Sequence, residues 1–455
     1  MEDSVRREYF ELLRFESVGA DPRKLRDCAA CAAWLKSWVE ACGFAAELVM
    51  PPVKDGVAAP PVLFAERKGA EGAPTVLFYG HYDVQPADPV EEWNTPPFEP
   101  VERDGLVYCR GAEDDKGQSF AFLCGMRDWL SENGGANGAK LNVKIVLEGQ
   151  EESGSKALGE LARGELKKRL AADVLAVCDT GAAEDMRPAI VAGLRGVSHF
   201  TIRLRGANRD LHSGQYGGVA PNAAQAIAEL VASLHNADGS IAVDGFLDGV
   251  EPPSDRERAL AAESLPSAEA FAADIGVEAC GGERAKPLEA RNCFEPTIEV
   301  NGIHSGYGGP GSKTVIACEA VAKISMRLVP GQSVRGAFEA VRRHLEAHVP
   351  PGMALAVEDY TPGAGGFRLP LASPVFGIAG EVLEKMDARG PVFMWDGASI
   401  PVVSALREAS GGAPLIVGWG QASNRIHSPN ENFAIAQFDK AREWARRILE
   451  ALSTI

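Results

Sequence analysis

Basic residues are scarce in this chain of 455 residues, which carries 46 Lys and Arg against 63 Asp and Glu. Nucleic acids and anionic membranes favour basic surfaces, so neither is expected as a partner. No apolar run approaches the roughly 20 residues that span a bilayer. The first residues, MEDSVRREYFELLRF, lack the apolar core of a secretory signal. We therefore expect a cytoplasmic globular protein.

The cysteines do not have the pattern of a disulfide scaffold. They number nine, an odd count, and most have apolar neighbours, as in Val177-Cys178. Reduced, buried thiols of a cytosolic protein are the expected state. Cys28 and Cys31 form a C-x-x-C, but they lie in an alanine-rich run that favours a helix. Packing is therefore preferred to a redox or zinc role.

What the sequence does contain is an alternation of strand-like and helix-like segments. Short apolar runs typical of buried strands lie at 74–80, 142–147 and 174–178. Helical patterns lie between them, at 118–133 and 157–169. This alternation predicts an α/β fold with a parallel or mixed sheet and helices on its faces. A strand-like run at 414–418 and a helix over 435–452 continue the pattern near the end.

The middle of the chain has a different pattern of predicted strands and helices. A half-exposed strand is predicted at 199–204, a helix at 222–235 and a hairpin-like section at 314–328. We expect an inserted α+β domain of roughly 170 residues, which is a normal domain size. It would end at the breaker-rich stretch 362–366. The predicted boundaries are 1–193 and 367–455 for the two parts of the first domain, and 194–366 for the inserted domain.

The first predicted strand is followed by a histidine and a carboxylate. In extended backbone, His81 and Asp83 share a face because side chains two residues apart point the same way. A carboxylate beside a metal-binding histidine fixes the tautomer of its ring. In α/β sheets, ligands bind outside the carboxyl ends of strands, where these residues lie. A surface histidine next to a solvated aspartate explains this segment alone equally well.

Two further segments are rich in carboxylates. Glu113, Asp114 and Asp115 stand in a row, where they repel one another unless a cation neutralises them. After the second strand, Glu151 and Glu152 are adjacent, so their side chains diverge. One can bind a metal while the other takes a proton from the water that the metal activates. A solvated acidic turn and an acid pair at a helix N-terminus are the competing interpretations.

Two single residues complete the set. Asp179 follows the third predicted strand, and His427 lies in a loop after the last one. Each by itself fits a solvated loop residue. Together, the five segments place two histidines and several carboxylates at strand ends, a donor set that suits zinc, manganese or cobalt. The coincidence of all five predicts a metal site.

In this order, the segments resemble the motifs of the M20 family of metallopeptidases, and within it the carnosinase-like dipeptidase branch. The matching segments are GHYDVQP (80–86), RGAEDDKG (110–117), EGQEESGS (148–155), CDTG (178–181) and HSPNE (427–431). The resemblance covers nearly the whole chain and includes GLRGV, DLHSGQYGG and RLVPGQ in the inserted region. It implies a mixed-sheet di-metal catalytic domain with an inserted lid or dimerisation domain.

The resemblance further implies two divalent cations per subunit. Asp114 would bridge both ions, and the Asp114–Asp115 peptide would be cis. The other ligands would be, for one ion, His81 and Asp179 and, for the second ion, Glu152 and His427. Asp83 would support His81. Zinc is the expected metal, and manganese or cobalt could serve the same ligands.

Catalytic and substrate-binding roles are also implied by the resemblance. Glu151 would activate the water as general base and later protonate the leaving amine. His212, from the inserted domain, would polarise the scissile carbonyl, reaching into the partner's site of a homodimer. The residues implied to contact the small-molecule substrate are Arg327, Asn301, Thr314 and Ser399.

Metal-dependent hydrolysis of the amide bond of dipeptides, with a two-metal-activated water, is therefore the expected function. Asp179 favours the dipeptidase and aminopeptidase side of the family that the chain resembles, because some relatives with carboxypeptidase-like preference carry Glu there. Hydrolysis of N-acyl or N-carbamoyl amino acids is the first alternative, because pocket shape decides between these amides. A metal-binding protein without turnover is the alternative of another class. Glu151 argues against it, because a structural metal site needs no base beside it.

Overall fold

The computed structural model of the protein describes residues 1–52, 58–133, 140–397 and 400–454. The chain divides into two compact units. Unit 1 comprises Met1–Ala192, Leu369–Met394 and Val402–Ile455, and unit 2 comprises Gly193–Arg368 and Trp395–Pro401. Unit 2 is thus an insertion in the chain of unit 1, and it includes a short second segment. Ser399, predicted to line the substrate pocket, lies outside the described residues.

Unit 1 is built on a mixed sheet, which confirms the predicted fold class. Its strands have the order β1-β2-β6-β3-β7-β17-β8, and β16 pairs with β8. Their bounds are Ala45–Val49 (β1), Val62–Arg67 (β2), Thr75–His81 (β3), Asn142–Glu148 (β6), Val174–Val177 (β7), Ala189–Leu194 (β8), Val392–Asp396 (β16) and Ala413–Ile416 (β17). The four central strands β6, β3, β7 and β17 run parallel. Their carboxyl ends therefore meet at one edge of the sheet.

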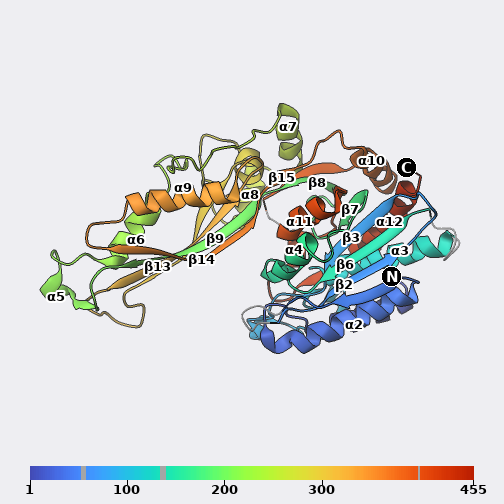
Figure 1. Cartoon of the computed structure of the whole chain (residues 1–455), viewed down its shortest axis with the longest axis horizontal. Coiled ribbons are helices and arrows are strands. Elements are labelled where there is room, and N and C mark those ends of the chain that lie inside the picture. Colours follow the sequence, from blue (N-terminus) through green and yellow to red (C-terminus); the bar gives the residue numbers. More distant parts are fainter. Residues whose placement is uncertain (53–57, 134–139, 398–399, 455) are drawn as a thin grey trace. The chain divides into compact units, whose positions relative to one another are not determined.

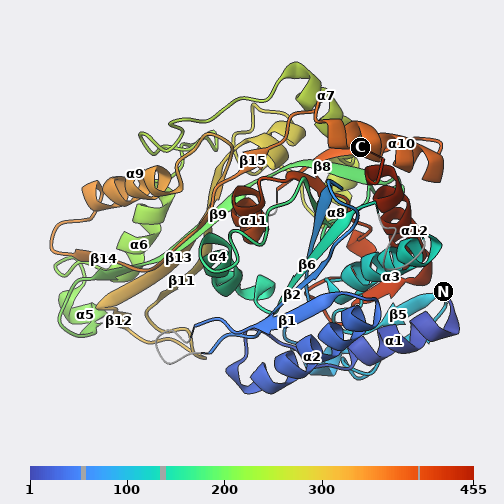
Figure 2. The ribbon, with the colours of Figure 1, turned by 45° about the vertical axis from the view of Figure 1, so that its right-hand side comes forward.

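Helices cover both faces of this sheet, which explains why its central strands are continuous apolar runs. α3 (Lys116–Glu132) and α12 (Ile435–Leu452) lie on one side, and α4 (Lys156–Arg163) and α11 (Pro401–Ser410) on the other (Figures 1 and 2). Phe122 of α3 stacks on Phe78 of β3 with ring centroids 4.0 Å apart. Aromatic and aliphatic packing of this kind fixes α3, which begins directly after the Asp114–Asp115 loop.

The remaining elements of unit 1 lie around this sandwich. They are α1 (Asp3–Leu13), α2 (Leu25–Ala41), α10 (Pro374–Met386) and a small antiparallel sheet of β4 (Val101–Arg103), β5 (Leu106–Tyr108) and β18 (Asn432–Ala434). α2 carries Cys28 and Cys31, both buried and free, as expected of packing residues. Among the described residues, no helix combines the length and apolar character needed to cross a bilayer.

Unit 2 contains a four-stranded antiparallel sheet of order β11-β13-β9-β14. The strands are β9 (Gly196–Arg205), β11 (Thr297–Ser305), β13 (Glu319–Leu328) and β14 (Ala354–Ala364). α6 (Ala223–Ala232) and α9 (Val334–Ala347) pack on it through a buried apolar core. Shorter elements complete the unit: β10 (Leu211–His212), α5 (Ser213–Tyr216), α7 (Asp255–Ser264), α8 (Ala268–Ile275), β12 (Val315–Ile316) and β15 (Phe367–Arg368).

The inserted domain was expected to end at the breaker-rich stretch 362–366, but the first residues of this stretch belong to a strand. β14 continues through Pro362 and Gly363 to Ala364, and its pairing with β9 shifts register twice, between Glu358 and Thr361 and again before Ala364. β14 is an edge strand, where proline is tolerated because only part of the strand's N–H groups is needed for pairing. The breakers therefore produce irregular pairing and not the end of the strand.

Candidate metal centre

The predicted metal ligands follow the carboxyl ends of neighbouring parallel strands. His81 is the last residue of β3, and Asp179 comes two residues after β7, its neighbour in the sheet. Glu152 follows β6, on the other side of β3. Because parallel strands end at the same edge, side chains far apart in the sequence meet there.

Three of these side chains form one group around His81. Its Nε2 atom lies 3.2 Å from Asp114 Oδ1 and 3.8 Å from Asp179 Oδ2. The ligand atoms of all three residues lie within 4.8 Å of one another. His81 is 1% exposed, so this group is enclosed by protein.

A second group shares Asp114 with the first. His427 Nε2 lies 2.9 Å from Asp114 Oδ2 and 3.3 Å from Glu152 Oε2. The ligand atoms of these three residues are again within 4.8 Å of one another. Each oxygen of Asp114 therefore faces a different histidine. The Asp114–Asp115 peptide is cis, as the resemblance implied. We call His81, Asp114, Glu152, Asp179 and His427 the ligand cluster.

Asp83 connects the cluster to the turn that carries the two glutamates. It is fully buried, and its Oδ1 lies 3.3 Å from His81 Nδ1. Its two oxygens accept the backbone N–H groups of Glu151 and Glu152, each at 3.2 Å. The backbone carbonyl of Asp83 lies closer to the same Nδ1 atom, at 3.1 Å. Asp83 thus orients the His81 ring through its carbonyl and its carboxylate, and the carboxylate also holds the backbone of a further ligand and its neighbour.

Neighbouring charges in the cluster shift one another's pKa. The pKa of His427 is raised to about 10 by its contacts with Asp114 and Glu152. Burial raises the pKa of Asp179 to about 6, although His81 opposes this. Burial disfavours charge on Asp114, but the neighbouring imidazoles of His427 and His81 outweigh burial and hold its pKa below the usual range. Without a cation, protons on the histidines offset the carboxylates.

The donor set fits divalent cations. Although carboxylate oxygens lie near it, the buried His81 Nε2 makes no hydrogen bond of adequate geometry. An orphaned imidazole nitrogen that faces carboxylates is what a metal ligand offers. Two imidazole nitrogens with three carboxylates suit zinc, manganese or cobalt. Each group of three ligands also leaves room in a four-coordinate shell for a water or a substrate atom.

Glu151 lies next to the cluster without belonging to either group. Burial raises its pKa well above the usual range, and the positive character of His81 opposes this shift. A carboxylate whose pKa is raised is a stronger proton acceptor than an ordinary carboxylate. The geometry therefore separates Glu152, which faces His427, from Glu151, which belongs to neither ligand group.

The structure places the other predicted site residues within unit 2. His212 ends β10 and is exposed, and Thr314 Oγ1 lies 3.5 Å from its Nε2. Arg327 lies on β13 opposite Thr297 of β11. Asn301 sits at the bulge between Val300 and Gly302, farther along β11. His212 and Thr314 thus form one neighbourhood, and Arg327 and Asn301 share the β11–β13 strand pair.

Several residues that support the cluster were not singled out from the sequence. Gln85 donates its side-chain amide to Glu152 Oε2 at 2.7 Å. The fully buried Asp115 accepts Ser119 Oγ at 2.6 Å and the backbone N–H of His81 at 3.2 Å. A buried ion pair joins Arg110 to Glu431 at 2.7 Å. All four residues, Gln85, Arg110, Asp115 and Glu431, lie inside the matched motifs, and this position next to the ligands was the available signal.

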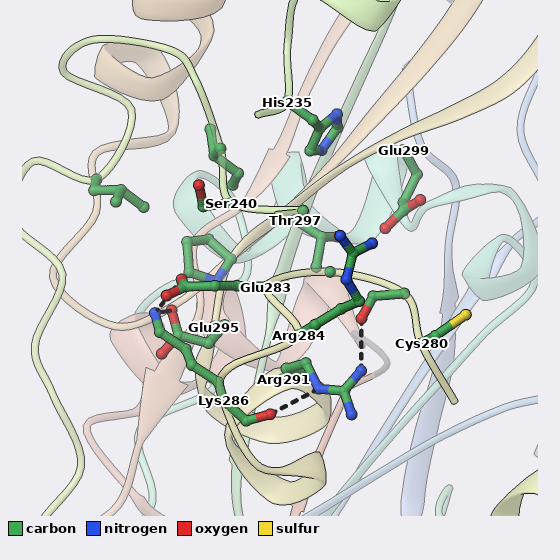
Figure 3. Close-up of a pocket in the computed structure, with 16 residues that line it drawn as sticks. His235, Ser240, Cys280, Glu283, Arg284, Lys286, Arg291, Glu295, Thr297 and Glu299 are labelled. Atoms are coloured by element: carbon green, nitrogen blue, oxygen red, sulfur yellow. Dashed lines mark hydrogen bonds and ion pairs between the residues drawn. The ribbon is translucent and has the colours of Figure 1, made fainter. Parts of the chain in front are cut away.

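A separate cavity of about 410 Å³ lies in unit 2 and is lined by residues from 235–299 (Figure 3). Its lysine, Lys286, pairs with Glu283 at 2.9 Å and Glu295 at 2.8 Å. Arg291 donates to backbone carbonyls, including that of Lys286 at 3.1 Å. These charges hold the surrounding loop together, and no predicted site residue lines the cavity.

Comparison with known proteins gives matches over most of the chain. Residues 77–451 match the pattern of peptidase family M20/M25/M40. The Beta-Ala-His dipeptidase of Rattus norvegicus is 28% identical over 382 residues, which cover 82% of this chain and 76% of the relative. The Cys-Gly metallodipeptidase of Saccharomyces cerevisiae is 28% identical over 397 residues, 85% of this chain and 81% of the relative. The solved M20 family metallo-carboxypeptidase of Sulfolobus solfataricus has 27% identity and a TM-score of 0.86 over 100% of both chains.

Proposed function

The chain belongs to peptidase family M20/M25/M40, and we propose that it is a metallodipeptidase, which hydrolyses the amide bond of dipeptides with two divalent cations. The proposal is supported by relatives that are named as dipeptidases for Beta-Ala-His and for Cys-Gly. We propose zinc as the metal, with manganese or cobalt as substitutes for the same ligands.

One observation carries the proposal. The ligand atoms form two groups of three that share Asp114, and a non-ligand carboxylate, Glu151, directly precedes the ligand Glu152. A site that only stabilised the fold would need neither the shared ligand nor a neighbouring base. Hydrolysis needs both a means of acidifying water and a group that takes its proton.

The metal ligands, Glu151 and Asp83 have separate roles in the proposed reaction. Bound in the two groups, divalent cations would acidify water and stabilise negative charge on the substrate's carbonyl oxygen. Glu151 takes the proton of the attacking water and returns it to the leaving amine, so that no net proton is consumed at this carboxyl group. Asp83 keeps His81 and the Glu151–Glu152 backbone in place through its carbonyl and its carboxylate.

His212 is proposed to donate a hydrogen bond to the scissile carbonyl, as a residue of a lid or dimerisation domain that reaches a partner subunit's site. Its Nδ1 accepts the backbone N–H of Gly214 at 3.1 Å. This contact assigns the ring proton to Nε2, the atom that lies 3.5 Å from Thr314 Oγ1. An N–H donor of this kind can stabilise charge that develops on an oxygen during the reaction.

The substrate's carboxylate is proposed to bind Arg327 and Asn301, with Thr314 and Ser399 completing the pocket. A guanidinium fork matches the geometry of a carboxylate. We also propose a cytoplasmic homodimer. The nine cysteines are all free, which suits a reducing compartment.

The test is release of free amino acids from a panel of dipeptides, N-acyl amino acids, N-carbamoyl amino acids and tripeptides. Purified protein is loaded with zinc or manganese, and a chelator serves as the control. Chelator-sensitive cleavage of dipeptides is the expected result. Cleavage confined to acyl or carbamoyl substrates would move the substrate class, and trimming of longer peptides would favour the carboxypeptidase activity of the Sulfolobus relative. No turnover by folded, metal-loaded protein would refute the proposal.

A further inference from the structure

Glu431 is a buried carboxylate that the hydrolytic reaction does not use. It follows the His427 loop directly and precedes β18, whose pairing with β5 brings it beside Cys109. Its side chain is 0% exposed. A carboxylate removed from water in this way is destabilising unless donors compensate it, so its partners indicate its role.

Four donors surround the two oxygens of Glu431. Oε2 accepts Arg110 Nη1 at 2.7 Å and the backbone N–H of Gly111 at 3.0 Å. Oε1 accepts the backbone N–H of Glu113 at 3.0 Å and that of Asp114 at 3.2 Å. Each oxygen has two lone-pair positions, so the carboxylate is saturated. Glu431 is therefore available neither as a metal ligand nor as a base.

Arg110 extends the same network to other segments of the cluster. It is 1% exposed, and its Nη2 donates to the carbonyls of Pro86 at 3.2 Å and Ser428 at 3.3 Å. Pro86 ends the motif that contains His81, and Ser428 is next to His427. The guanidinium also lies over the Trp93 ring, 5.3 Å from its centroid. One planar fork thus joins the segments that carry His81 and His427.

The backbone of the His427 loop needs such support. Arg425, His427 and Asn430 all have positive φ, at 58°, 57° and 64°. This region is sparsely populated by residues other than glycine, and it persists where the surroundings over-determine it. The side chain of Asn430 provides part of this support: its Oδ1 accepts the backbone N–H of Asn94 at 2.7 Å, and its Nδ2 donates to the Glu92 carbonyl at 2.9 Å.

We propose that Arg110 and Glu431 are positioning residues, which set Asp114 and His427 relative to each other so that the second cation finds its ligands already in place. Their partners are the backbone of Asp114 on one side and of Ser428 on the other. The pair acts through these ligands and touches neither substrate nor reacting atoms. The inference rests on the proposed di-metal function, because it concerns the occupancy of that site.

The deciding variant is Arg110→Lys, which keeps the charge but cannot make the three contacts of the fork at once. Zinc and manganese affinities are measured by competition with a chromophoric chelator, at a temperature where circular dichroism shows folded protein. We expect one of the two ions to bind roughly 10- to 100-fold more weakly, as for other outer-sphere partners of ligands. Activity should fall by a similar factor at limiting metal and recover in part with excess metal.

A matched control separates positioning from stability. Arg442 also forms a bidentate pair, with Asp128 at 2.5 and 2.9 Å, between α12 and α3. Arg442→Lys should lower the midpoint of thermal unfolding while both metal affinities stay as in the wild type. Glu431→Asp, which keeps the charge but shortens the side chain, should behave like Arg110→Lys and provides a second reading if either variant folds poorly.

The outcomes are distinct. Folded Arg110→Lys or Glu431→Asp protein with wild-type affinity for both ions overturns the positioning role, as does an equal loss of affinity in Arg442→Lys. Wild-type protein that binds no cation overturns the proposed function itself. Wild-type protein that binds and turns over, with variants that lose one ion selectively, supports both.

Discussion

The ligand cluster in unit 1 and the His212–Thr314 pair in unit 2 differ in how much structure holds them. The cluster is held by buried groups: His81 is 1% exposed, Asp83 and Asp115 beside it are fully buried, and the exposed His427 lies on a loop whose Ser428 carbonyl accepts a hydrogen bond from the buried Arg110. His212 is exposed, and its ring contacts the Thr314 hydroxyl at 3.5 Å and the backbone N–H of Gly214 at 3.1 Å. The metal ligands are thus pre-organised by folding, while the position of His212 at a substrate depends on further contacts. Variants of the two regions should therefore fail in different ways.

Asp114→Asn should have the largest effect, because Asp114 is the ligand common to both groups. We expect kcat/KM to fall by about 10³-fold or more, since several kcal/mol of transition-state stabilisation would be lost. Metal content per chain, measured by plasma mass spectrometry, should fall for both ions. Asp104→Asn, in the exposed β4–β5 turn, is the isosteric control and should match the wild type. Two tightly bound ions in Asp114→Asn protein would contradict the shared-ligand assignment.

Glu151→Gln tests the difference between a ligand and its neighbour. The amide cannot take a proton from water, so turnover should fall by about 10²- to 10⁴-fold. Metal content should stay near that of the wild type, because Glu151 belongs to neither ligand group. Glu71→Gln, at an exposed turn, controls for the loss of one negative charge. Near-wild-type turnover of Glu151→Gln would exclude Glu151 as the base.

His212→Ala should affect turnover alone. Loss of one donor to the carbonyl oxygen lowers kcat by about 10²- to 10³-fold. An exposed side chain contributes little to folding, so the free energy of unfolding should change by less than about 0.5 kcal/mol. Metal content should not change. A clear loss of stability or metal would show that His212 has a structural role and would weaken the contrast between the two regions.

Mixing the two inactive variants tests whether His212 acts in a partner's site. A mixed dimer would hold one complete site, made of Glu151 from the His212→Ala subunit and His212 from the Glu151→Gln subunit. Random exchange of equal amounts would then restore about a quarter of wild-type activity. The control is a mass-tagged subunit that verifies exchange. Verified exchange with no recovery would place His212 at the site of its own chain.

Sequence patterns predicted the parts of this molecule that are governed by local rules. Strand β6 and helix α12 begin where the apolar pattern placed them, at Asn142 and Ile435. The two ligand groups contain the residues that the resemblance implied, and His81, Glu152 and Asp179 meet because parallel strands end at a common edge. Glu431 was not foreseen, because its role depends on contacts with residues more than 300 positions away in the chain. Pro362 and Gly363 lie within β14 although a break was expected there, because an edge strand tolerates breakers that a central strand would not.

The smallest expected effect is on the pH dependence of stability. In the unfolded chain the pKa of His427 is about 6.5, whereas in the folded protein Asp114 and Glu152 raise it to about 10. A folded pKa above the unfolded one means that protonation stabilises the fold. This contribution is complete below about pH 6.5 and is lost as the pH rises through about 10. Burial raises the pKa of Asp179 to about 6, so the free energy of unfolding also falls as the pH rises from about 4 to 6.

A divalent cation takes the place of these protons, because metal binding requires neutral imidazole and ionised carboxylates. Chelator-treated protein should therefore show a melting temperature that falls by a few degrees from pH 6.5 to 9.5, as scanning calorimetry would measure. Zinc-loaded protein should lack this decline, so the stabilisation by zinc should grow with pH. In His427→Gln protein the decline without metal should also be reduced. A melting temperature of the chelated protein that rises with pH would mean that His427 is not held in its charged form by Asp114 and Glu152.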